Sequence, residues 1–336
     1  MSGQESVRRL AARRTILGAG LAAGFSGLLG PVLAGCAPVA RSGVITVAGG
    51  EPGGFYLEFA ELLAASLQLH GVAESSVVKA TGGSLDNIGH LLSGRATLAV
   101  ALADAASGQV KGGGAAAGNI VALGKVYENY VHALVRKDSG IRSINDLAGR
   151  TAGVGRQGSG TSQIAPRILE VAELGESSSG DGSGKSATMV DLGLNDGLRA
   201  LIGGGIDALF WSGGVPTAAI AAAHRKAGLA LLDLSATLPA LRQRYGSFYD
   251  KVLVPEDSYA GMPAVWTVGV ANLLLCRGDL DASTVRRTVE LLVGNAGELI
   301  PQSSVGVQFL SPESLINTAD VPLHPDAAAA YRELHG

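Results

Sequence analysis

Short apolar runs alternate with amphipathic stretches along most of the chain after residue 43. Residues 44–48, 77–80 and 98–102 are mostly apolar or β-branched, which is typical of buried strands. Between them, residues 57–68 and 85–92 carry apolar side chains at intervals of three and four, as in a helix with one buried face. This strand–helix–strand–helix–strand order predicts a parallel sheet with helices on both faces.

The same alternation starts again further along the chain. Residues 131–135 are predicted as a strand, and strands at 151–154, 189–190 and 206–211 follow, with helices from about residues 162 and 195 between them. A strong strand at 268–275 precedes a helix at about 283–300. The Gly/Ala-rich segment 105–118 and the Ser/Gly-rich segment 177–186 have no periodicity and are predicted as loops.

Two series with a late return of the chain predict two α/β lobes. We expect the first lobe at 44–130 plus 270–336 and the second at 131–269, with crossovers near 131–135 and 268–275, and not one continuous sheet. A chain of 336 residues, 47% of them hydrophobic, has enough material for both lobes. The net charge of -3 and the lack of a basic cluster argue against nucleic acid as a partner.

Residues 1–36 have the features of an export signal. Four arginines near the start precede an apolar stretch at 16–29, which is short for a membrane span. The sequence Leu-Ala-Gly-Cys at 33–36 looks like a bacterial lipobox, so we expect Cys36 to be lipidated and to become the mature N-terminus. Residues 13–17 resemble a twin-arginine signal, and 37–43 are expected to be a linker. The alternatives are an ordinary N-terminal membrane anchor, or a disulfide between Cys36 and Cys276.

Four glycine-rich loops each follow a predicted strand, at residues 49–56, 82–84, 158–161 and 212–216. Ligands bind beyond the carboxyl ends of strands in open α/β sheets, and helix N-termini favour anionic groups there. One such loop could be only a tight turn, whereas four in equivalent positions favour a shared cleft. The ligand-binding residues expected from these loops are Gly50, Gly54, Phe55, Tyr56, Gly83, Ser84, Asn87, Ser159, Gly160, Thr161, Trp211, Ser212, Gly213 and Gly214. Trp211 could equally be a core residue at the end of its strand.

No pattern for catalysis or for a cofactor stands out. Residues 153–158 match the spacing Gly-x-Gly-x-x-Gly, but the region where a dinucleotide site needs an acidic residue falls in the Ser/Gly-rich loop. No lysine follows these glycines as in a phosphate-binding loop, and no catalytic triad or metal-ligating set can be assembled. We therefore expect a monomeric binding protein without cofactor or metal, and not an enzyme.

The glycine loops, in this order, resemble those of the TAXI family of TRAP-transporter solute receptors. The resemblance runs from about residue 45 to 300 and rests on 49–56, 81–87, 98–104, 126–128, 136–147, 154–161, 196–210, 213–216 and 267–277. Departures are the apparent insertion at 177–186, Phe55 where the family often has threonine, and Trp211-Ser212 before the last glycines.

This resemblance implies a type II periplasmic-binding-protein fold, in which two lobes joined by crossover strands close on a ligand. It also implies an extracytoplasmic receptor that hands a small carboxylate, such as a 2-oxo acid or a glutamate-like acid, to a TRAP-type membrane permease. An ABC-transporter receptor of the same fold and a sensing module for a signalling kinase remain alternatives. We expect helix N-termini at residues 55, 84 and 161 to face the acid group, and Ser84→Ala and Thr161→Ala each to weaken binding.

Overall fold

The computed structural model describes residues 42–112, 117–175, 186–301 and 312–335. The predicted leader with Cys36, and residues 177–185 of the predicted insertion, lie outside these ranges. The strands are β1 (Ser42–Ala48), β2 (Ala73–Lys79), β3 (Leu98–Leu102), β4 (Ile120–Arg136), β5 (Thr151–Gly153), β6 (Thr188–Val190), β7 (Ala208–Gly213), β8 (Leu229–Leu231), β9 (Tyr249–Val254) and β10 (Val265–Arg277). The α-helices are α1 (Phe55–Leu69), α2 (Ser84–Leu92), α3 (Ala103–Lys111), α4 (Thr161–Val171), α5 (Leu194–Gly203), α6 (Ala218–Ala227), α7 (Leu238–Tyr245), α8 (Ala282–Gly294), α9 (Pro312–Leu315) and α10 (Pro325–His335).

The first lobe is built on the predicted series β1–α1–β2–α2–β3. Its three strands are parallel and lie in the order β2-β1-β3. Helix α1 buries Phe59, Leu63 and Leu67, which share one helical face, and all five residues of β3 are buried. Strand β1 begins at Ser42, so the last two residues of the expected linker belong to the sheet.

The second lobe repeats this topology with β5–α4–β6–α5–β7. These strands are also parallel and lie in the equivalent order β6-β5-β7. A separate hydrophobic cluster joins α5 to β7 and α6, and includes Leu198, Leu201, Leu209 and Ile220. In both lobes the first strand lies between the other two, so the loops after its carboxyl end open at a topological switch point, where α/β proteins bind ligands.

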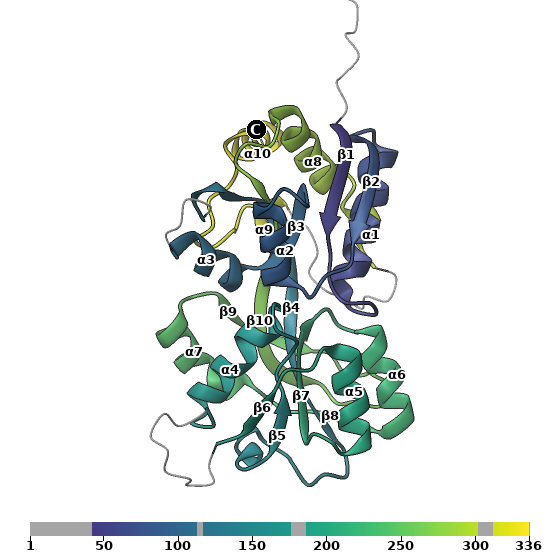
Figure 1. The fold of residues 1–336 in the computed structure, drawn as a ribbon, viewed down its shortest axis with the longest axis vertical. Helices are drawn as coiled ribbons and strands as arrows, with labels where there is room; N and C mark the ends of the chain where they lie inside the picture. Colours follow the sequence, from purple (N-terminus) through teal and green to yellow (C-terminus); the bar gives the residue numbers. More distant parts are fainter. Residues whose placement is uncertain (1–41, 113–116, 176–185, 302–311, 336) are drawn as a thin grey trace, which may run out of the picture. The chain divides into compact units, whose positions relative to one another are not determined.

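Strands β4 and β10 run from one lobe to the other (Figure 1). Strand β10 pairs with β3 in the first lobe, and the carboxyl-terminal part of β4 pairs with β7 in the second. Because both strands are shared, hydrogen bonds join all ten strands into one sheet, in place of the two sheets expected from the sequence; β8 and β9 branch from β4 and β10. Strand β4 is also much longer than the predicted 131–135. The prediction missed its first part because polar residues at 125 and 127–130 interrupt the apolar pattern there.

One predicted loop is wrong, because residues 105–111 of the segment 105–118 belong to helix α3 (Ala103–Lys111). Its first turn consists of small residues and one acid, and Ala103, Asp104, Ala105 and Ala106 are all buried. Such short side chains leave no wide apolar stripe to detect in a sequence, although they fit closely against β3 and β10.

The carboxyl-terminal helices belong to the first lobe. Helix α8 packs on α1 and α10, and the Tyr331 hydroxyl of α10 donates to the Leu123 carbonyl of β4 at 2.8 Å. Near α8, Glu298 accepts a hydrogen bond from Ser66 of α1 at 2.6 Å. None of the described helices is long and apolar enough to cross a membrane.

Candidate functional site

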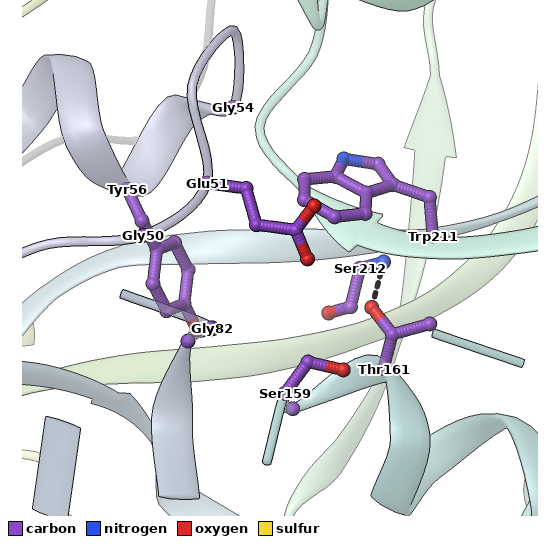
Figure 2. Close-up of a pocket in the computed structure, with 11 residues that line it drawn as sticks. Gly50, Glu51, Gly54, Tyr56, Gly82, Ser159, Thr161, Trp211 and Ser212 are labelled. Carbon is purple, nitrogen blue, oxygen red and sulfur yellow. Dashed lines mark hydrogen bonds between the residues drawn. The ribbon is translucent and has the colours of Figure 1, made fainter. Parts of the chain in front are cut away.

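A small pocket lies where the carboxyl ends of strands from the two lobes meet (Figure 2). Its lining residues are Gly50, Glu51, Gly54, Tyr56, Gly82 and Gly83 from the first lobe, and Ser159, Gly160, Thr161, Trp211 and Ser212 from the second. The cavity volume is about 20 Å³, which is room for about one water molecule. In this conformation the lobes are therefore closed around the site.

Three hydroxyl groups form the second-lobe wall. Thr161 Oγ1 accepts a hydrogen bond from the Ser212 backbone N–H at 3.0 Å, as Figure 2 shows, and Ser159 Oγ accepts one from Ser162 N–H at 3.0 Å. Ser212 Oγ accepts a third from the Asn129 amide at 3.1 Å. A hydroxyl has one proton to donate besides its acceptor sites, and none of these three donates to another described residue. The wall thus offers three O–H donors to an acceptor in the pocket.

Two aromatic side chains flank these hydroxyls. The Tyr56 hydroxyl is buried within 3.3 Å of both Ser84 Oγ and the Asn129 amide, and burial raises the pKa of Tyr56 far above its usual value. Tyr56 is therefore neutral at physiological pH. Trp211 lines the pocket and also donates its indole N–H to Thr217 Oγ1 at 3.3 Å. It therefore combines the role of a pocket residue with that of a packed residue at the end of its strand.

Glu51 is a pocket residue that the sequence interpretation missed, and Gly82 is the other. Glu51 Oε2 accepts a hydrogen bond from the Leu194 N–H at the start of α5, at 3.0 Å. The pKa of Glu51 is raised above its usual value, because the effect of burial exceeds the opposing effects of this N–H and of the charge of Arg156. The sequence did contain a signal for Glu51, namely an acidic residue in a glycine-rich loop directly after a strand. In such a loop most side chains lie close to the cleft.

Other predicted site residues lie behind the pocket and do not line it. Ser84 Oγ accepts from Leu102 N–H at 3.1 Å, and the Asn87 amide donates to the carbonyls of Gly49 and Val100. The Phe55 ring packs on Tyr127 with ring centroids 5.0 Å apart, and also on the backbone of Gly214, where a side chain would collide with it. Gly213 is similarly covered by the Trp211 ring. These residues support the walls of the pocket.

Direct contacts hold the two lobes together around the pocket. The N–H groups of Leu85 and Asp86, in the first turn of α2, donate to the Gly158 carbonyl of the second lobe at 2.9 and 3.1 Å. This helix terminus, expected to face a ligand, is thus bonded to protein in the closed conformation. On another side, the buried Asp104 of α3 bonds Arg167 of α4 at 2.8 Å and the Tyr249 hydroxyl at 3.0 Å.

Two α/β lobes with a pocket between the carboxyl ends of their strands form the fold of periplasmic solute-binding proteins, as the sequence predicts. The chain belongs to the NMT1-like family, whose sequence profile matches residues 47–334.

Solved structures share this fold at low sequence identity. A protein of Bordetella bronchiseptica RB50 is 15% identical, with 88% of this chain and 99% of that chain covered and a TM-score of 0.50. A structure described as a periplasmic transporter is 13% identical, with 88% and 93% covered and a TM-score of 0.50. Identities this low speak for the common fold alone.

Proposed function

We propose that this protein is an extracytoplasmic receptor that binds a small carboxylate-bearing solute and delivers it to a TRAP-type membrane permease. The observation that carries the proposal is the wall of three hydroxyls, from Ser159, Thr161 and Ser212. Each oxygen already accepts a protein N–H, so each proton is left to bond an acid group. Hydrogen bonds to a charged group are the strong ones in a closed, poorly solvated site.

Binding without catalysis fits the ionisable groups of the pocket. Glu51 and Tyr56 are the titratable side chains among its lining residues, and Tyr56 stays neutral. A general acid–base pair or an activated nucleophile would need a second group poised near neutral pH. No group of three or more His, Cys, Asp or Glu residues within the described ranges could hold a metal ion.

The TRAP assignment rests on the resemblance to TAXI receptors. Several stretches that carry the resemblance, among them 49–56, 81–87 and 154–161, supply lining residues of the pocket.

We place the lobes at 44–130 plus 270–336 and at 131–269, with ligand contacts to both lobes favouring the closed state. The repeated topology and the position of α8 and α10 support these boundaries.

Cys36 would hold the receptor at the membrane surface through a lipid. The argument is the arginine-rich start, the apolar stretch and the Leu-Ala-Gly-Cys motif. We expect the mature protein to begin at Cys36 and to sediment with membranes, and Cys36→Ser to block lipidation. Intact protein found soluble and unlipidated in its native envelope would contradict the anchor.

Mass spectrometry of the solute released from purified protein tests the binding function directly. We expect a small molecule with a carboxylate, at close to one per chain. Release of a neutral sugar or a bare metal ion would contradict the carboxylate assignment. Crosslinking in native membranes then identifies the partner: an ABC permease or a signalling kinase in place of a TRAP permease would overturn the delivery step.

A further inference from the structure

Glu51 places a carboxylate inside the pocket. Hydrogen bonds within the protein satisfy one of its two oxygens. The side chain reaches from the β1–α1 loop of the first lobe to the start of α5 in the second, where Oε2 accepts the Leu194 N–H. Oε1 is buried and has no hydrogen-bond partner among the described residues. Figure 2 shows the carboxylate between the Tyr56 ring and the Trp211 indole, facing the hydroxyl wall.

A buried carboxylate oxygen without a donor is energetically costly, and its neighbours do little to offset the cost. The nearby cation is Arg156, whose side chain is 52% exposed and lies 3.9 Å from a second carboxylate, that of Asp86. Solvent and Asp86 therefore screen most of its charge from Glu51. An incoming group with N–H donors and a positive charge would satisfy Oε1, whereas a ketone or a second carboxylate would meet it oxygen to oxygen.

We infer that Glu51 determines specificity by accepting a hydrogen bond from a positively charged nitrogen on the ligand, while the hydroxyls of Ser159, Thr161 and Ser212 hold its acid group. The preferred ligand is then a small zwitterion with an ammonium and a carboxylate, and 2-oxo and 2-hydroxy acids are poor ligands. This inference rests on the proposed function and narrows its solute class. Closing the lobes brings the two recognition groups to one ligand, because Glu51 comes from the first lobe and the hydroxyls from the second.

Glu51→Gln is the informative variant, because it removes the charge and keeps the shape. The amide oxygen can still accept the Leu194 N–H, so the contact between the lobes survives. Glu61→Gln is the matched control: it makes the same change on the exposed side of α1.

Calorimetry on matched sets of ligands measures the effect. Two sets contain an amino acid, its 2-oxo acid and its amine: alanine, pyruvate and ethylamine; valine, 2-oxoisovalerate and isobutylamine. Glutamate and 2-oxoglutarate form a third pair. We expect the wild type and Glu61→Gln to bind an amino acid at least tenfold more tightly than its 2-oxo acid. Glu51→Gln should lose about ten- to a hundredfold in affinity for that amino acid and change little for the 2-oxo acid.

The outcomes separate this inference from the function beneath it. A 2-oxo acid that binds the wild type as tightly as its amino acid, or an unchanged ratio in Glu51→Gln, overturns the role of Glu51 and leaves the carboxylate receptor standing. Binding of the simple amines with no gain from the carboxylate supports Glu51 and overturns the acid class. No binding of any member to the wild type overturns both.

Discussion

The hydroxyl of Thr161 joins two parts of the pocket wall, since it accepts the Ser212 N–H and can donate to a ligand. Thr161→Val keeps the shape but removes both bonds. We expect affinity for the released solute to fall by about ten- to a hundredfold, the effect of losing one hydrogen bond to a charged group. Calorimetry measures it, with Thr188→Val, at the exposed first position of β6, as the control. Affinity within threefold of wild type would remove Thr161 from the site.

Ser84 has the hydroxyl expected of a ligand-binding residue, but it supports the pocket wall and does not line the pocket. Its hydroxyl already accepts the Leu102 N–H and lies against Tyr56, so Ser84→Ala is now expected to lower stability more than affinity. The glycine loops could be recognised from the sequence because turn chemistry is local. Which of their side chains reach the cleft depends on how two distant loops meet, and Glu51 was missed for that reason.

His132 on β4 makes stability depend on pH. Its Nδ1 bonds the Tyr130 carbonyl and its Nε2 bonds the Tyr259 hydroxyl, which in turn accepts the Thr217 N–H. Because Nδ1–H donates to that carbonyl, Nε2 of the neutral imidazole accepts the proton of the Tyr259 hydroxyl. Burial lowers the pKa of His132 from 6.5 to about 4. The unfolded chain therefore takes up a proton below pH 6.5 that the folded protein refuses until about pH 4.

This difference in pKa corresponds to about 3 kcal/mol of stability, fully present above pH 6.5 and lost as the pH falls to 4. Urea unfolding from pH 7.5 to 4 measures it in the wild type and in His132→Gln, which cannot titrate. We expect the wild type to lose more stability than the variant over that interval. Parallel curves would show that His132 is not the group responsible.

Among the elements, α3 and α4 face each other across the two lobes through one buried ion pair. Asp104 in the first turn of α3 is fully buried and is held by Arg167 of α4 and by Tyr249 of β9. Removing one partner leaves a buried charge uncompensated, so Arg167→Met should destabilise the protein by about 3–5 kcal/mol.

The double variant Asp104→Asn/Arg167→Met is the control, because it removes both charges together. Denaturant unfolding at pH 8 should find it more stable than Arg167→Met alone. Equal losses in the single and double variants would mean that the pair contributes by shape and not by charge.

Element prediction worked where one periodicity dominates a segment. Strands β3 and β7 and helices α1, α4 and α5 were found within a few residues, because their apolar side chains recur at strand or helix spacing. It failed for the first half of β4, where Lys125, Glu128 and Asn129 interrupt the apolar run as the strand passes between the lobes. A strand shared by two lobes has a mixed environment, and its sequence pattern is mixed for the same reason.

For the whole molecule, closure depends on the absence of a side chain at Gly160. Its backbone is helical, with φ -65° and ψ -32°, so alanine causes no local strain. A β-carbon there would lie 2.5 Å from Leu102 and 2.8 Å from the Ser84 hydroxyl, both in the first lobe. Gly160→Ala should act as a wedge that obstructs the closed state.

We expect Gly160→Ala to weaken solute binding at least tenfold while the unfolding temperature without ligand changes little. Small-angle scattering should show a larger radius of gyration in the presence of solute than wild type has. Gly89→Ala in α2, where a β-carbon meets nothing within 4 Å, is the control. Unchanged affinity in Gly160→Ala would mean that the neighbouring side chains make room.

The return of the chain to the first lobe also governs when that lobe can be completed. Leu123 receives its hydrogen bond from Tyr331, 208 positions later, and Ser66 donates to Glu298, 232 positions later. During synthesis, strands β1 to β3 therefore leave the ribosome long before β10, α8 and α10 exist to cover them. Folds dominated by such distant contacts assemble slowly. If the proposed export takes the chain unfolded, this delay is an advantage, because translocation can begin before the first lobe is complete.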